Sequence, residues 1–217
     1  MDKQAILSRV DHTELNPAAT WEDIRRLCDE GVRFGVASVC IPPCYVKRAA
    51  TYLEGKLPVC TVIGFPHGNS PTAAKAAEAK WVVAAGAEEV DMVINQGFVK
   101  DGLYEAVTDE IRIIKQAVGD KILKGIIETC RLSNDEIDAL CRSVTQAGAD
   151  FIKTSTGFAE GGATVEAVAR MAAGVGEGVQ VKAAGGIRTF EAARAMLEAG
   201  AHRIGARALV RVAMGVE

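Results

Sequence analysis

The segment AGADFIK at residues 147–153 has close variants at two other places in the chain, AGAEEVD at residues 85–91 and AGAHRIG at residues 199–205. In each copy a glycine follows a helix-like segment, and a short strand-like segment comes next. Glycine commonly ends a helix in a left-handed conformation, so each copy predicts a helix end, a turn and a strand start. A weak internal repeat of this kind indicates a chain built from βα units.

Short apolar or β-branched segments alternate with longer amphipathic ones along the whole chain. The segments expected to form strands are residues 8–13, 34–41, 57–65, 88–95, 121–128, 150–155, 179–185 and 202–206. Eight βα units predict an α/β fold, the TIM (β/α)8 barrel, and a flavodoxin-like open sheet with fewer strands is the alternative. No low-complexity segment or Pro/Ser-rich linker interrupts the pattern, so we expect one domain over residues 1–217.

Helix boundaries also have signals in the sequence. Ser133 is expected to cap a helix with Glu136 three residues later, and Gly148 is expected to end it. Similar glycine stops are expected at three more places, Gly31, Gly86 and Gly200. In the segment before Pro71, either Asn69 or Ser70 is expected to cap the next helix.

Composition limits the classes of partner and compartment. The chain has 25 Lys and Arg against 28 Asp and Glu, and its basic residues are scattered, so we expect no nucleic-acid partner. No segment approaches the roughly 18 apolar residues that span a bilayer, which predicts a cytoplasmic protein that does not enter a membrane. The six cysteines have no disulfide spacing, and no Cys/His pair follows Cys40 and Cys44, so we expect reduced thiols and no metal site.

Three ionisable residues, Asp91, Lys153 and Lys182, stand late in predicted strands. The C-terminal ends of barrel strands carry the active site, and strand alternation allows these side chains to converge inside. Two ammonium groups in an apolar barrel repel one another, so one should lose its proton well below the pKa of about 10.4 of a free lysine. A neutral lysine attacks a carbonyl group to form a Schiff base, and Asp91 can move protons through a water molecule.

Each of these features also has a structural alternative. A lysine at a strand end is often salt-bridged, and Asp91 can pair with its neighbour Lys124. The glycine-rich segments KTSTGF and KAAGGIRT follow the two lysines. Gly157, Gly185 and Gly186 can bring backbone N–H groups close to a phosphate, or they can be ordinary turn residues.

Seven motifs occur in a fixed order across nearly the whole chain: DHTEL, VCIPPCYV, VIGFPHGN, EVDMVIN, KGIIETC, AGADFIKTSTGF and VKAAGGIRT. Their combination resembles the deoxyribose-phosphate aldolases, class I aldolases of deoxynucleoside breakdown. The resemblance implies reversible cleavage of 2-deoxy-D-ribose 5-phosphate to D-glyceraldehyde 3-phosphate and acetaldehyde. It implies no metal or organic cofactor, a phosphorylated sugar and acetaldehyde as the small-molecule partners, and a homodimer as one possible assembly.

The resemblance also assigns roles by position. Lys153 matches the family's Schiff-base lysine, Lys182 the lysine that assists it in proton transfer, and Asp91 the acid/base aspartate. The residues that match pocket and phosphate-side positions are Asp11, Thr13, Cys40, Thr156, Gly157, Gly185 and Gly186.

One departure from the family pattern follows the last predicted strand. The family usually has small hydroxyl residues there that bind phosphate, whereas this chain has Ala206 and Arg207. Arg207 either binds the phosphate by a charge-assisted contact or points outward and leaves phosphate affinity reduced. The competing functions are a Schiff-base aldolase or transaldolase with another donor or a non-phosphorylated acceptor, and a barrel that binds a phosphorylated ligand without catalysis.

Overall fold

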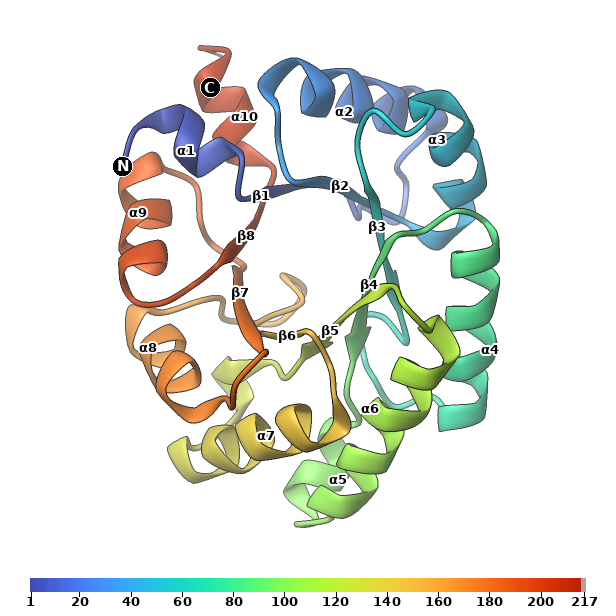
Figure 1. Cartoon of the computed structure of the whole chain (residues 1–217). Helices are drawn as coiled ribbons and strands as arrows, with labels where there is room; N and C mark the ends of the chain where they lie inside the picture. The colour runs from blue at the N-terminus through green and yellow to red at the C-terminus, as the bar shows by residue number, and fades with distance from the viewer. Residues whose placement is uncertain (216–217) are drawn as a thin grey trace.

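The computed structural model describes residues 1–215, and within them eight parallel strands close into a barrel in chain order (Figure 1). The strands are β1 (Val10–Thr13), β2 (Ser38–Ile41), β3 (Val59–Ile63), β4 (Glu89–Val93), β5 (Ile122–Ile126), β6 (Phe151–Lys153), β7 (Gln180–Ala184) and β8 (Arg203–Ala206). β1 pairs with both β2 and β8, which closes the ring. The TIM-barrel prediction is confirmed, and the open-sheet alternative is wrong. The last two residues of the predicted domain, 216–217, lie outside the described residues.

Helices surround the strands as an outer ring (Figure 1). They are α1 (Lys3–Leu7), α2 (Trp21–Phe34), α3 (Val46–Leu53), α4 (Thr72–Ala84), α5 (Gln96–Lys100), α6 (Tyr104–Val118), α7 (Asn134–Ala147), α8 (Val165–Gly174), α9 (Phe190–Glu198) and α10 (Ala208–Ala213), with the 3₁₀ turns η1 (Pro43–Tyr45) and η2 (Thr129–Arg131). Among residues 1–215, no helix is both long enough and apolar enough to cross a membrane.

Local capping explains where α7 begins and ends. Ser133 Oγ accepts a hydrogen bond from the Glu136 N–H at 3.3 Å, and the Glu136 carboxylate accepts one from the Ser133 N–H at 2.6 Å. Gly148 ends the helix with a φ of 75°, so this prediction is confirmed. The prediction for α4 is wrong, because Pro71 itself is the N-cap residue and no side chain caps the helix.

Gly31 shows that a glycine can serve packing instead of termination. It lies inside α2, where an added Cβ would stand 2.7 Å from Leu57 Cδ2, so the helix approaches the barrel closely at this point. The helix ends four residues later at Gly35, whose φ is 60°. Gly86 and Gly200 follow the ends of α4 and α9 with φ of 108° and 111°, as expected.

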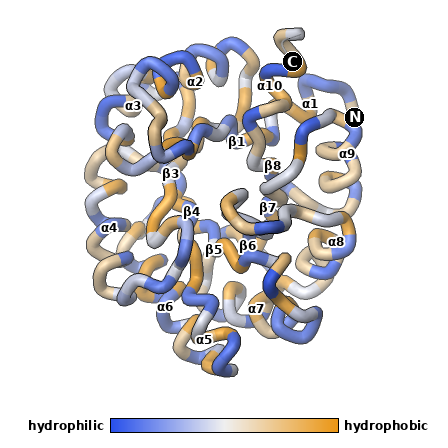
Figure 2. The backbone as a smooth tube through the Cα atoms, turned by 180° about the vertical axis from the view of Figure 1, so that it is seen from behind, coloured by the Kyte–Doolittle hydropathy of each residue, from blue (hydrophilic) through white to orange (hydrophobic). Residues whose placement is uncertain are grey.

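Two layers of side chains result from strand alternation. On β4, Val90 and Met92 belong to the large apolar core outside the barrel, whereas Glu89 and Asp91 belong to the cluster inside it. Apolar and polar residues mix along the helices of the outer ring (Figure 2), as expected for helices that bury one face. The barrel interior is therefore free to hold polar side chains while the outer layer supplies the hydrophobic core.

Candidate active site

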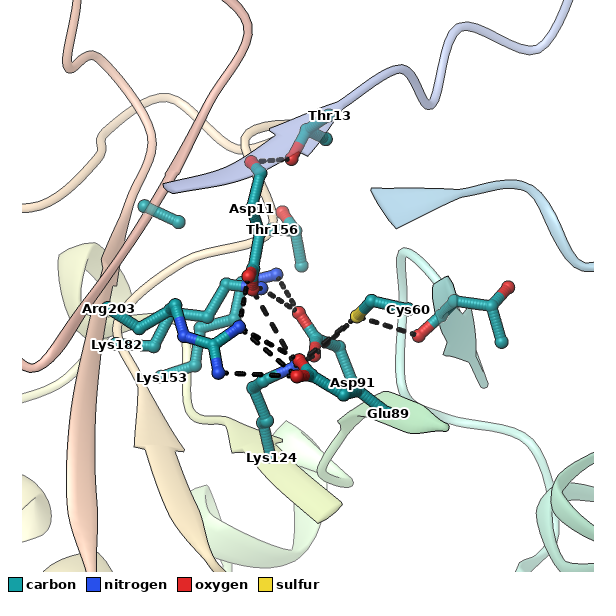
Figure 3. Close-up of polar contacts among 12 residues, drawn as sticks. Asp11, Thr13, Cys60, Glu89, Asp91, Lys124, Lys153, Thr156, Lys182 and Arg203 are labelled. Carbon is teal, nitrogen blue, oxygen red and sulfur yellow. Dashed lines mark hydrogen bonds and ion pairs between the residues drawn. The ribbon is translucent and has the colours of Figure 1, made fainter. Parts of the chain in front are cut away.

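A cluster of charged side chains fills the interior of the barrel (Figure 3). Its members come from six strands and are Asp11, Glu89, Asp91, Lys124, Lys153, Lys182 and Arg203. The register places Lys153 of β6 directly beside Lys182 of β7, and Asp91 of β4 directly beside Lys124 of β5. Because buried charges are costly when unpaired, opposite charges must compensate one another here.

Asp91 lies at the centre of this cluster and is fully buried. Its Oδ2 accepts hydrogen bonds from Lys153 Nζ at 2.7 Å and from Lys182 Nζ at 2.6 Å, and its Oδ1 accepts one from Lys124 Nζ at 2.8 Å. Burial acts to raise the pKa of the Asp91 carboxyl, but the charges of the three lysines outweigh burial and hold that pKa well below its ordinary value. Asp91 is therefore a carboxylate at neutral pH.

Lys182 is held between two carboxylates. Its Nζ forms ion pairs with Asp11 Oδ2 at 2.5 Å and with Asp91 Oδ2 at 2.6 Å. Burial acts to lower the pKa of Lys182, but Asp11 and Asp91 outweigh it and raise that pKa above its ordinary value. Gly205 leaves room for this side chain, since a Cβ there would stand 3.2 Å from Lys182 Cε. Lys182 is therefore an ammonium ion.

These contacts correct the expectation of two lysines in apolar surroundings. The two amines meet on one carboxylate oxygen, and more acids and bases surround them, so carboxylates offset the repulsion that the sequence predicted. Asp91 does pair with Lys124, as the structural alternative proposed, and the same carboxylate contacts Lys153 and Lys182 as well. The structural contact and a chemical role are thus compatible.

A cavity of about 450 Å³ opens above Lys153 at the C-terminal ends of the strands. Lys153 is only 3% exposed, so its amine forms part of the cavity floor. The other predicted site residues in its lining are Thr13, Thr156, Gly157, Gly185, Gly186 and Arg207. Gly157 and Gly185 have φ of 84° and 86°, a left-handed conformation that lets the backbone turn close to the cavity. Asp11, Asp91 and Lys182 lie deeper in the barrel, where Lys182 forms an ion pair with each of the two acids.

Cys40 is not among the residues that line the cavity. It is buried beside Cys60 and Val62, and Leu15 and Phe65 pack against this small group. A hydrogen bond with Cys60 lowers the pKa of the Cys40 thiol, and Lys182 contributes to the lowering, while burial opposes it. Cys40, Cys60 and Asp91 place their ligand-type atoms within 4.8 Å of one another, and so do Asp11, Cys60 and Glu89. Basic side chains already pair with all three carboxylates of these groups, so an incoming metal cation would have to displace them.

Several residues of the site were not predicted. Arg203 donates hydrogen bonds to both Asp11 and Glu89. It follows His202 in a predicted strand with an alternating pattern, and that alternation could have indicated a side chain inside the barrel. Arg188 lines the cavity, and the segment GGIRT was its signal. Glu128 has a positive φ of 58° and accepts hydrogen bonds from the Thr156 N–H and hydroxyl, so it fixes the turn after Lys153. No sequence pattern indicated Glu128.

A larger groove of about 730 Å³ lies outside the barrel, where α7 and α8 supply most of its lining. It contains none of the predicted site residues. This groove is therefore not the site that the sequence predicts.

Comparison with known proteins agrees with this geometry. The family model for DeoC/LacD family aldolases matches residues 5–216. A deoxyribose-phosphate aldolase of Clostridioides difficile is 53% identical over 95% of this chain and 94% of its own, and one of Streptococcus pyogenes is 51% identical over 98% and 95%. The solved tetrameric deoxyribose phosphate aldolase of Aeropyrum pernix has a TM-score of 0.91 at 35% identity, covering 99% of this chain and 92% of that one. With a barrel, a buried lysine cluster and a family match over nearly its full length, this chain belongs to the DeoC/LacD family of aldolases.

Proposed function

We propose that this protein catalyses the reversible cleavage of 2-deoxy-D-ribose 5-phosphate to D-glyceraldehyde 3-phosphate and acetaldehyde. The observation that carries the proposal is the Lys153 amine at the cavity floor, 2.7 Å from a carboxylate that also binds the Lys182 ammonium. Relatives about half identical over nearly the whole chain are named for this activity. Lys153 is the proposed nucleophile, Asp91 the proton carrier, and Lys182 the cation that assists proton transfer.

The proposed cleavage begins when the uncharged Lys153 amine adds to the C1 aldehyde of the open-chain sugar. The carbinolamine takes up a proton at its hydroxyl group and loses water, which gives a protonated imine. Asp91, through a water molecule, accepts the proton of the C3 hydroxyl, and the C2–C3 bond breaks as its electrons move toward the imine nitrogen. Glyceraldehyde 3-phosphate leaves, and the enamine takes at C2 the proton that Asp91 accepted, which restores a protonated imine. A water molecule then adds to this imine and releases acetaldehyde, the free amine and the proton taken up earlier. The imine nitrogen serves as the electron sink, so the mechanism requires no metal or organic cofactor.

The phosphate of the substrate is proposed to bind at the opposite side of the cavity from the deep acids. Gly185 and Gly186 follow β7, and a phosphate in a barrel commonly binds at the loops after the last two strands. Arg188 and Arg207 line the same region and supply positive charge. Thr156 and Gly157 complete this side of the lining.

The assembly and location remain predictions from the sequence. The solved Aeropyrum relative is described as tetrameric, whereas the sequence resemblance implied a homodimer. The cytoplasmic location and the lack of a nucleic-acid partner likewise stay predictions.

The proposed function is tested by measuring glyceraldehyde 3-phosphate released from 2-deoxyribose 5-phosphate, for the wild type and for Lys153→Ala. The expected result is turnover by the wild type and loss of at least about 1,000-fold in kcat for the variant, since the covalent step is removed. Lys80→Ala, which changes an exposed lysine of α4, is the matched control. Turnover by Lys153→Ala at the wild-type rate would refute the assignment.

A further inference from the structure

One ion pair at the cavity belongs to none of the steps described above. Arg207, in the lining, donates a hydrogen bond through Nη1 to Oε2 of Glu14. Both residues follow strand ends, Glu14 after β1 and Arg207 after β8, and the pairing of His12 with Ala206 brings these two ends together. Closure of the barrel therefore places the Glu14 carboxylate beside the Arg207 guanidinium in the region where we propose that phosphate binds.

Glu14 is held in place from several sides. Its N–H donates to the Cys40 carbonyl oxygen at 2.9 Å, and its Oε1 accepts from the Asn16 N–H at 2.9 Å. Only 7% of its side chain is exposed, against 46% for Arg207. A nearly buried carboxylate retains its counter-ion strongly, because loss of the partner would leave the charge uncompensated.

The two cations of the cavity lining therefore differ in whether they have an ion-pair partner. Arg207 is paired with Glu14, whereas Arg188 is exposed and has no ion-pair partner among residues 1–215. A phosphate that approaches Arg207 must share it with the Glu14 carboxylate, which also repels the anion. Thr13, Leu15 and Asn16 line the cavity, but Glu14 does not, so any effect of Glu14 on a ligand runs through Arg207 or through its charge.

We propose that Glu14 restrains Arg207 and thereby lowers the preference of this enzyme for phosphorylated over unphosphorylated substrates. This inference rests on the proposed function for its substrate. Glu14 is a positioning residue in this account, since it acts on the phosphate through Arg207. Removal of its charge would release the guanidinium for the phosphate and remove a repelling anion.

The test compares Glu14→Gln with the wild type on 2-deoxyribose 5-phosphate and on 2-deoxyribose. The expected result is a rise of about three- to tenfold in the ratio of kcat/KM for the phosphorylated to the unphosphorylated sugar, with the change in KM, because the removed charge acts on the phosphate through the half-exposed Arg207. Glu14→Asp keeps the charge and is expected to stay closer to the wild type. A purely steric role predicts the reverse order, because Gln has the shape of Glu and Asp does not.

Glu198→Gln is the matched control, because it removes one exposed carboxylate at the end of α9, the end that leads into β8. An unchanged ratio for Glu14→Gln would overturn the proposal, because Glu14 would then have no effect on specificity. A lower ratio would also overturn it and would mean that Glu14 orients Arg207 toward the phosphate. Binding of inorganic phosphate, measured by calorimetry, separates this inference from the proposed function. If the wild type cleaves neither sugar, the proposed function fails, yet tighter phosphate binding by Glu14→Gln would still support the role of Glu14.

Discussion

At the scale of single residues, the central feature of the site is one carboxylate that forms ion pairs with several amines. Asp91 contacts Lys124, Lys153 and Lys182, while Lys182 has Asp11 as a second acid. The second acid stabilises the charge of Lys182, and Lys153 alone of the two adjacent lysines lines the cavity. Lys153 and Lys182 therefore have different roles because different side chains surround them.

This difference in roles predicts the behaviour of Lys182→Met. Without the Lys182 ammonium, Asp11 and Asp91 lose the cation that they share, and the group proposed to assist proton transfer is absent. We expect kcat to fall by about 100-fold or more. The measurement is kcat for the wild type and the variant, with Lys80→Met as the exposed-lysine control. A kcat of Lys182→Met equal to that of the wild type would argue against this role of Lys182.

At the scale of helices and strands, the repeated glycine motif predicts the order of the elements correctly but their boundaries less accurately. The eight predicted strands all contain the observed ones, but several were too long, and residue 34 of the second belongs to α2. The prediction of a helix end at Gly31 is wrong because sequence alone does not distinguish a glycine with positive φ from one that permits close packing. That distinction depends on Leu57, which is distant in sequence and close in space.

The cap of α7 contributes to stability. Ser133→Ala should lower the free energy of unfolding by about 1 kcal/mol, because the N–H of Glu136 loses its acceptor. Ser70→Ala is a matched control, since Ser70 caps no helix and should change stability by less than about 0.5 kcal/mol. Urea unfolding of both variants decides the matter. Equal losses would show that the Ser133 cap contributes nothing specific.

At the scale of the whole molecule, closure of the barrel assembles a site from residues spread over most of the chain. Convergence of Asp91, Lys153 and Lys182 was predictable, because strand period and the shared direction of parallel strands place late residues at one end. The ion pair by which Arg203 offsets the charge of Asp11 was not predictable, because it depends on the pairing of β1 with β8. The Glu128 contact to Thr156 depends on a left-handed turn that no local pattern indicates.

The buried charges also predict how the fold responds to acid. The pKa values of Asp11 and Asp91 are lowered in the folded protein, so the stability they contribute is present above the unfolded value of about 3.9 and is lost as pH falls toward the folded values. Each carboxyl adds a slope of about 1.4 kcal/mol per pH unit in that range. Urea unfolding at pH 7, 4 and 3 should show little loss to pH 4 and a steep loss below it. A flat free energy of unfolding between pH 4 and pH 3 would contradict the buried-carboxylate account.

Mass spectrometry of the protein after acetaldehyde and sodium borohydride would show directly whether Lys153 is the nucleophile, because borohydride reduces an imine to a stable ethyl-amine. An ethyl group is expected on the peptide that carries Lys153, and it should be absent from Lys153→Ala and from a sample without acetaldehyde. An unmodified, folded wild-type protein, or an adduct confined to Lys182 or Lys124, would contradict the assignment of Lys153 as the nucleophile.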